Sequence, residues 1–314
     1  MGRFDGKVAI VTGGARGVGR SHAILLASEG AKVIVNDYGG GWDGVGQDPR
    51  PATQVAEEIR ASGGQAVANH GDVADWQSGQ DLIQLAIETY GRLDILVCNA
   101  GIIRDRTSFK MSEEEWDAVV RVHLKGHFVP TRFATAYWRE RAKSTGQPVN
   151  GRIVYTASES GLFGNPGQLN YSAAKAGIIA MAIVVSSEMK KYGVTANTIC
   201  PRARTRLAEG GLGAFKIEEG VFDAWHPDNI APWVAYLCSD DAGHITGQTF
   251  VVSGGEIQLM QGWTKVNAIN KDDRWTLDEL TEASAELFGD RSTDTPTVSR
   301  DIIPTLPVGS HNGS

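Results

Sequence analysis

Short runs of apolar residues alternate with helix-length segments from Val8 to Val252, and this alternation limits the fold more than any other feature. Each run is apolar at successive positions, so both faces of the strand that it forms must be buried. Strands of this kind, joined by helices, form a parallel sheet covered by helices on both faces. We therefore predict a doubly wound α/β fold with a seven-stranded parallel sheet. The predicted strands cover residues 8–11, 33–35, 66–68, 95–97, 153–155, 194–199 and 249–252, and the predicted helices cover 17–28, 55–61, 82–89, 116–138, 171–189 and 230–238.

The C-terminal part of the chain departs from this pattern after about Gly255. We expect one domain over residues 1–256, followed by an extension over 257–314 that carries a short amphipathic helix within 272–288. Large apolar side chains left in water forfeit roughly 1.5–3 kcal/mol each. We therefore expect the extension to dock, either on the substrate side of its own chain or on a neighbouring subunit. The residues that lead to this expectation are Trp263, Trp275, Leu277, Leu280 and Leu287.

Composition and charge exclude several classes of protein. With 41% hydrophobic and 21% charged residues, the 314-residue chain is not of the disordered type. A net charge of −7 argues against a nucleic-acid partner. The three cysteines lack CxxC spacing, and no HExxH motif occurs, so we expect free thiols and no metal site. The first residues do not resemble a signal peptide, and no apolar run approaches the ~18–20 residues of a membrane span. We expect a cytoplasmic protein with no membrane partner.

A glycine-rich segment, Thr12-Gly13-Gly14-Ala15-Arg16-Gly17-Val18-Gly19, follows the first predicted strand and opens the first helix. In this position, backbone N–H groups approach a pyrophosphate at the positive end of the helix. The second strand ends at Asp37, whose carboxylate can accept hydrogen bonds from an adenosine ribose and would repel a 2′-phosphate. Arg16 is ambiguous: it could meet a 2′-phosphate, bind the pyrophosphate or pair with Asp37. On balance these residues predict NAD as cofactor. They are Gly13, Arg16, Gly17, Val18, Gly19 and Asp37.

A second group of residues carries the chemistry. Tyr171 and Lys175 are four residues apart in a predicted helix and share one face, while Ser158 follows a predicted strand. A phenol has a pKa near 10 and is a poor base at neutral pH. A lysine ammonium about 4 Å away is worth roughly 4 kcal/mol at an effective dielectric near 20. We therefore expect Lys175 to lower the pKa of Tyr171, so that Tyr171 removes an alcohol proton while Ser158 holds the substrate oxygen.

With these motifs, and with Asp72-Val73, Cys98-Asn99-Ala100-Gly101 and Tyr171-Ser172-Ala173-Ala174-Lys175, residues 5–256 resemble the short-chain dehydrogenase/reductase family. The resemblance implies a Rossmann-type fold and a proton relay from Tyr171 through Lys175 to water. It implies the following contacts with the nucleotide: Asp72 and Val73 at the adenine, Asn99, Ala100 and Gly101 along the nucleotide, Tyr171 and Lys175 at the ribose, and Ile199 and Thr205 at the nicotinamide. The family's relay asparagine is His123 here, which is either a relay imidazole or a buried packing residue.

A narrower resemblance, to the (3R)-hydroxyacyl-CoA dehydrogenase module of peroxisomal multifunctional β-oxidation enzymes, rests on segments 36–46, 101–106, 121–126 and 164–171. It implies NAD-dependent oxidation of a secondary alcohol, with an acyl-CoA as the small-molecule substrate. Two alternatives remain at this point: a dehydrogenase of steroids or other apolar alcohols, and a non-catalytic nucleotide sensor. The helix that begins near Tyr171 is apolar around most of its circumference, so we also expect a homodimer or homotetramer.

Overall fold

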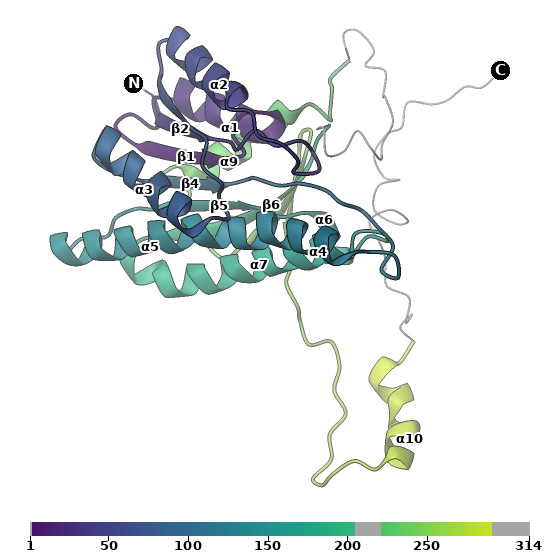
Figure 1. Ribbon diagram of the computed structural model, residues 1–314. Helices are drawn as coiled ribbons and strands as arrows, with labels where there is room; N and C mark the ends of the chain where they lie inside the picture. Colours follow the sequence, from purple (N-terminus) through teal and green to yellow (C-terminus); the bar gives the residue numbers. More distant parts are fainter. Residues whose placement is uncertain (1, 205–220, 291–314) are drawn as a thin grey trace.

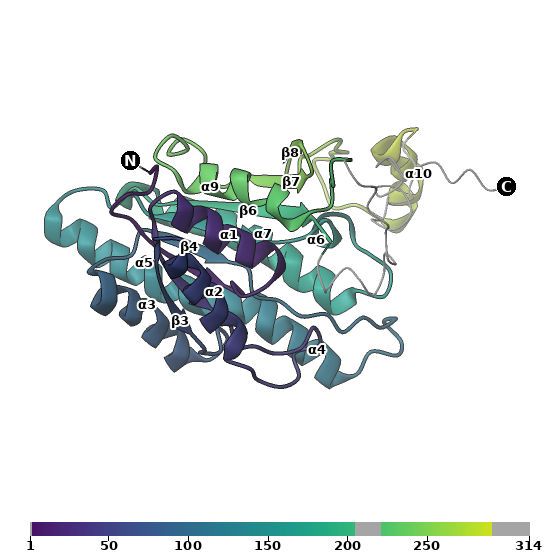
Figure 2. The same cartoon turned by 90° about the horizontal axis from the view of Figure 1, so that it is seen from above.

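In a computed structural model of the chain, residues 2–204 and 221–290 are described. They contain a single sheet of eight strands in the order β3-β2-β1-β4-β5-β6-β7-β8 (Figures 1 and 2). The first seven strands are parallel, as predicted. Their bounds, with that of the eighth, are β1 Val8–Thr12, β2 Lys32–Asn36, β3 Gln65–Asn69, β4 Ile95–Cys98, β5 Arg152–Thr156, β6 Thr195–Arg202, β7 Thr249–Ser253 and β8 Glu256–Met260.

The eighth strand corrects the prediction of a purely parallel seven-stranded sheet. β8 turns back on β7 and pairs with it antiparallel, with Ser253 opposite Glu256. An edge strand has one face in solvent, so it lacks the continuous apolar run from which the other strands were predicted. Ile257 and Leu259 are indeed exposed in β8. The sheet therefore extends to Met260, past residue 256, where the sequence pattern suggested that the core ends.

Helices cover both faces of the sheet (Figure 2). One face packs against α1, α2 and α9, and the other against α3, α5 and α7, so the protein has two apolar cores separated by the sheet. The helices have these bounds: α1 Gly17–Ser28, α2 Arg50–Ala61, α3 Trp76–Tyr90, α4 Glu113–Val120, α5 Gly126–Thr145, α6 Glu159–Phe163, α7 Leu169–Met189, α9 Ala231–Cys238 and α10 Leu277–Phe288, with one π-helical turn, η1 Arg121–Lys125, and two 3₁₀ turns, η2 Lys190–Tyr192 and η3 Pro227–Asn229.

The single long helix predicted over 116–138 is two helices in the structure. A capping box of Ser112 and Glu115 begins α4, and the π-helical turn η1 separates it from α5. A π turn widens the helix locally and commonly marks a functional site. Here it contains His123, so the departure from regular geometry coincides with a predicted site residue.

The helix α7, with η2, is the one stretch of the described chain long and apolar enough to cross a membrane by length and composition. In the fold it packs along β5 and β6 and against α5, and Ile178 and Ala182 are buried in the core beneath it. Part of its apolar surface is therefore buried within the α/β domain, while Ile183 and Val184 are exposed.

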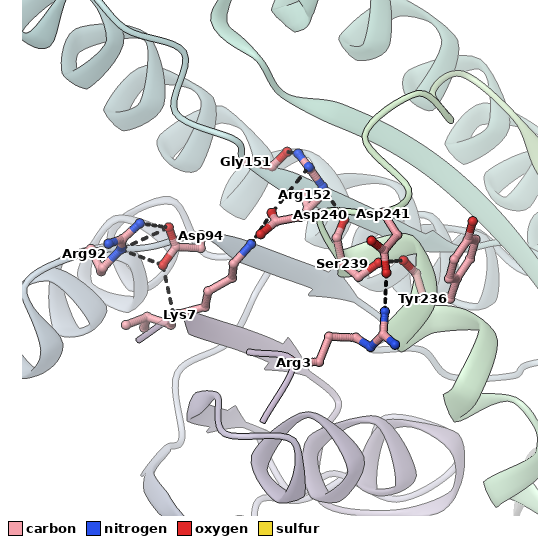
Figure 3. Close-up of polar contacts among 11 residues, drawn as sticks. Arg3, Lys7, Arg92, Asp94, Gly151, Arg152, Tyr236, Ser239, Asp240 and Asp241 are labelled. Carbon is pink, nitrogen blue, oxygen red and sulfur yellow. Dashed lines mark hydrogen bonds and ion pairs between the residues drawn. The ribbon is translucent and has the colours of Figure 1, made fainter. Parts of the chain in front are cut away.

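The amino ends of the strands are held by charged side chains on the side opposite the glycine-rich turn (Figure 3). Asp94 accepts hydrogen bonds from the Val8 backbone N–H and from the Arg92 guanidinium. Arg152, almost fully buried at the start of β5, donates to the carbonyls of Gly151 and Ser239. Asp240 pairs with Lys7 and thereby ties the end of α9 to the chain before β1.

Beyond β8, the described part of the C-terminal extension lies away from the α/β body. In both views α10 stands apart from the α/β body (Figures 1 and 2), and Trp263 and Leu277 are fully or largely exposed. The extension makes its own internal contacts, since the Asn267 amide donates to the carbonyls of Glu286 and Leu287. Residues 261–290 therefore do not line the cavity of their own chain, and docking on the substrate side and docking on a neighbouring subunit both stay predictions.

Candidate active site

A cavity of ≈ 430 Å³ lies at the carboxyl ends of the strands. The strand order reverses between β1 and β4, because the chain leaves β3 at one edge and resumes on the other side of β1. At such a switch point the connecting loops diverge and leave a crevice, which is where doubly wound folds bind ligands. Most predicted site residues line this cavity: Gly13, Arg16, Gly17, Val18, Asp37, Asp72, Val73, Asn99, Ala100, Gly101, His123, Ser158, Tyr171 and Lys175.

The glycine-rich turn leaves no room for side chains. A Cβ on Gly13, whose φ is +61°, would lie 2.7 Å from the Ala100 Cα, and a Cβ on Gly19 would lie 2.1 Å from the Gly13 carbonyl oxygen. The Thr12 hydroxyl accepts hydrogen bonds from the backbone N–H groups of Asn99 and Ala100, which joins the ends of β1 and β4. No side chain caps the first turn of α1. The backbone can therefore approach a pyrophosphate closely at a helix N-terminus, so these residues fit a dinucleotide.

Asp37 is fixed by the backbone at the end of β2. Its carboxylate accepts hydrogen bonds from the N–H groups of Ala15 (3.1 Å) and Gly39 (2.8 Å). Arg16 does not pair with Asp37, because its guanidinium instead donates to the Gly40 carbonyl at 3.4 Å. This leaves Asp37 as a carboxylate in the cavity wall, where a ribose diol can donate to it.

The loop after Asp37 forms part of the cavity, which the sequence had not made clear. Tyr38, Trp42 and Gly44 line it. The loop is held against the segment after β4, since Ile103 N–H donates to the Trp42 carbonyl (2.9 Å) and Arg104 donates to the Asp43 carbonyl (2.8 Å). On the far side of the cavity, the Asp72 carboxylate accepts from Arg121 at 2.6 Å, which orients the loop that carries Val73.

The proposed catalytic residues come from neighbouring elements. Ser158 caps α6 at the end of β5, and Tyr171 and Lys175 lie one turn apart on α7. The Lys175 ammonium is 5.4 Å from the centroid of the Tyr171 ring and donates to the Thr156 carbonyl at 2.6 Å. The three residues therefore meet at one end of the cavity, as predicted.

The predicted lowering of the Tyr171 pKa is not found. Burial raises the pKa of Tyr171 to about 12, and hydrogen bonding by Ser158 opposes this only in part. Burial also lowers the pKa of Lys175 to about 7, so much of the lysine is neutral at neutral pH. The Coulomb argument assumed a fully charged lysine in a moderately polar site. In the protein alone, loss of solvation outweighs the attraction between the two groups.

His123 lies between the loop after β4 and Tyr171. Its Nε2 is 2.7 Å from the Ile102 carbonyl oxygen and 3.1 Å from the Ile102 nitrogen, and its ring packs edge-on against Tyr171. Burial, reinforced by the Lys175 charge, holds the pKa of His123 well below its usual value, so the imidazole is neutral. Its Nδ1 is buried and has no hydrogen-bond partner in the described chain.

Comparison with known proteins shows the family to which the chain belongs. Residues 7–207 match the short chain dehydrogenase family. The chain belongs to the short-chain dehydrogenases. A hydroxyacyl-CoA dehydrogenase of Mycobacterium tuberculosis is 42% identical over 96% of this chain and 94% of its own length. The structure of a short-chain dehydrogenase from Mycobacterium avium superposes with a TM-score of 0.84 and is 46% identical in sequence. The match covers 94% of this chain and 99% of that protein.

The peroxisomal multifunctional enzyme type 2 of Drosophila melanogaster is a longer relative. It is 43% identical over 85% of this chain, but the match spans only 41% of the enzyme. The match therefore covers one part of that enzyme. These relatives confirm the resemblance drawn from the motifs and show that this short-chain dehydrogenase is an oxidoreductase that uses a nicotinamide dinucleotide.

Two predicted site residues within the described chain do not line the cavity. Gly19 lies behind the glycine-rich turn, where its lack of a side chain makes room for the Gly13 carbonyl. Ile199 is completely buried within β6, and Pro201, Arg202 and Ala203, further along the same strand end, occupy the wall instead. Thr205 lies outside the described residues.

Sequence reasoning also missed a buried ion pair in the wall of this dehydrogenase. Arg202 Nε and Nη2 donate to the two carboxylate oxygens of Glu159 at 2.6 and 2.5 Å. The sequence offered no sign of this pairing, since Arg202 and Glu159 are 43 residues apart.

The Lys175 environment predicts a pH-dependent stability of the nucleotide-free protein. In the unfolded chain, lysine titrates near pH 10.4. Between about pH 7 and 10 the unfolded state therefore binds a proton that the folded state does not, and stability should rise with pH. Relative to Lys175→Met, the wild type should gain of the order of 2 kcal/mol in unfolding free energy between pH 7 and 9. Urea unfolding of both proteins at the two pH values measures this. A difference that stays constant with pH would show that Lys175 is charged in the folded protein.

Proposed function

We propose that this short-chain dehydrogenase oxidises the hydroxyl group of a (3R)-hydroxyacyl-CoA to a ketone, with NAD as the hydride acceptor. The observation that carries the proposal is the meeting of Ser158, Tyr171 and Lys175 at one end of the cavity that also fits a dinucleotide. The substrate class is supported by the Mycobacterium tuberculosis relative, a hydroxyacyl-CoA dehydrogenase that matches nearly the whole chain. A panel of (3R)-hydroxyacyl-CoAs, sterols and simple secondary alcohols, followed by NADH absorbance, tests the assignment.

The roles of the residues follow from their positions. Ser158 holds the substrate hydroxyl oxygen, and Tyr171 removes the hydroxyl proton. Lys175, buried beside Tyr171, takes part in proton transfer because its pKa of about 7 lets it accept and release a proton near neutral pH. When bound, NAD supplies the electrophilic ring carbon that accepts the hydride and the positive charge that favours ionisation of the tyrosine. Gly13, Asp37 and Asn99 would hold it along the cavity.

We propose that His123 participates in moving this proton to solvent. Its neutral ring has one nitrogen at the Ile102 carbonyl and a second, buried and unpaired in the described structure, that can bind a water molecule. With Nε2–H donated to the Ile102 carbonyl, Nδ1 of the neutral ring is a hydrogen-bond acceptor, so His123 can position the water molecule that carries the proton while the ring keeps its own proton.

Replacing Tyr171 by Phe should abolish most turnover while nucleotide binding persists. The phenol acts on the alcohol proton, and loss of a general base typically lowers the rate by 10²–10⁴-fold. Turnover in stopped assays, together with NADH binding by fluorescence, separates the two effects. Tyr90→Phe, the same change at a tyrosine of α3 that does not line the cavity, is the control. A Tyr171→Phe enzyme with near-wild-type kcat would remove Tyr171 as the base.

NAD should be preferred over NADP because a 2′-phosphate would face the Asp37 carboxylate. Asp37→Ser should lower the ratio of kcat/KM for NAD to that for NADP by roughly tenfold or more, since it removes both the ribose acceptor and the repulsion. Arg16→Met is the matched variant for the neighbouring cation and should reduce use of both nucleotides in similar proportion. A wild-type enzyme that favours NADP would show that Arg16 outweighs Asp37.

We propose that the protein is a homodimer or homotetramer. Ile183 and Val184 on α7 are each 53% exposed, and Phe128 and Trp116 expose large apolar surface on the neighbouring α5 and α4. Light scattering should give a mass well above the 33.6 kDa of one chain. A chain that ends at Gln261 keeps this apolar face and should remain oligomeric. A monodisperse monomer of the full chain would refute the proposal, and a monomer of the shortened chain alone would show that the extension holds the subunits together.

A further inference from the structure

The Arg202–Glu159 pair has a position that stability alone does not explain. Both side chains are less than 9% exposed, and both residues line the cavity together with Ser158 and Tyr171. Buried ion pairs contribute little net stability, because apolar residues of similar volume commonly serve as well. A charged pair kept in the wall of a reaction cavity therefore calls for a functional reason.

The pair fixes the guanidinium in the wall of the cavity that Ser158 and Tyr171 also line. Glu159 directly follows Ser158, and its carboxylate binds Arg202 through two hydrogen bonds of 2.5 and 2.6 Å. A two-point contact of this kind sets the plane of the guanidinium as well as its position. The end of β6 is thereby joined to the turn that presents Ser158, and the arginine is held in place before any substrate arrives.

Arg202 retains donors that the pair does not use. The Glu159 carboxylate accepts hydrogen bonds from Nε and Nη2 of Arg202. Within residues 2–204 and 221–290, no acceptor is hydrogen-bonded to Nη1. The remaining N–H groups can therefore donate to an oxygen atom in the cavity.

The local charge indicates what kind of oxygen this is. Glu159 neutralises the guanidinium, and Glu256 on β8 adds a further negative charge that acts on Arg202. An anionic carboxylate or phosphate would meet no net positive charge here. A neutral carbonyl needs only the directed N–H donors, so it suits the site better.

We propose that Arg202, held by Glu159, binds the thioester carbonyl oxygen of the substrate and thereby selects β-hydroxyacyl thioesters over simple secondary alcohols. This rests on the proposed function, which places the reacting hydroxyl carbon at Ser158 and Tyr171. In a 3-hydroxyacyl thioester the carbonyl carbon is two bonds from that carbon. Because Glu159 directly follows Ser158 and holds Arg202, the carbonyl of a substrate bound at Ser158 can meet the free donors of Arg202. Arg202 is a specificity-determining residue in this scheme and takes no part in proton or hydride transfer.

The test compares two ligands that differ only at the carbonyl. One is a (3R)-hydroxyacyl-CoA, and the other is its thioether analogue, in which a methylene group replaces the thioester carbonyl. The thioester is assayed as a substrate, and the thioether is assayed as a competitive inhibitor, so that a Ki is obtained even if the thioether is not oxidised. Arg202→Met alone would leave the Glu159 carboxylate buried without a partner, which is strongly destabilising. The principal variant is therefore the neutral pair Arg202→Met with Glu159→Gln.

The double variant should lower kcat/KM for the thioester by roughly 10- to 100-fold, while the Ki of the thioether changes less than about twofold. Arg204→Met, which removes a second paired arginine of the same segment that does not line the cavity, is the matched control and should leave both values unchanged.

Equal losses for thioester and thioether would overturn the proposal, because the pair would then only shape the cavity. An unchanged kcat/KM for the thioester in a folded double variant would also overturn it. A wild-type enzyme that oxidises apolar alcohols but no hydroxyacyl-CoA would overturn the proposed function itself, and the substrate panel identifies that result before any variant is made.

Discussion

The junction between the ends of β1 and β4 is the contact on which the site depends. One hydroxyl, that of Thr12, accepts N–H groups from Asn99 and Ala100, and the Gly13 backbone approaches Ala100 so closely that no side chain would fit between them. This contact joins the two strand ends beside the crevice that the reversal of strand order opens. The glycine-rich turn, the acid after β2 and the α7 residues then surround one cavity, although they are distant in sequence.

The fold could be predicted for those strands that are buried on both faces of the sheet. The parallel strands are apolar at successive positions because helices cover both faces, and the sequence shows this directly. β8 has one face in solvent and lacks that pattern, so it was not predicted. The break between α4 and α5 was also missed, because a π turn changes the hydrogen-bond spacing without changing the residue types that favour a helix.

The candidate site, like the fold, could be predicted only in part. Ser158, Tyr171, Lys175 and the glycine-rich turn could be located because their spacing along one strand end or one helix face is fixed by local geometry. The protonation of Lys175 could not be predicted, because it depends on how completely the surrounding elements exclude water. The partner of Arg202 was missed for a related reason: Glu159 comes from another strand end, and only the folded sheet brings the two together.

The two ends of the sheet carry different tasks. The cavity lies at the carboxyl ends of the strands. The charged contacts of Asp94, Arg152 and Asp240 fasten the amino ends (Figure 3). The length of the strands separates the two sets of residues. Charges at the amino ends of the strands can therefore be changed to adjust thermal stability or salt tolerance, while the residues that line the cavity keep their surroundings.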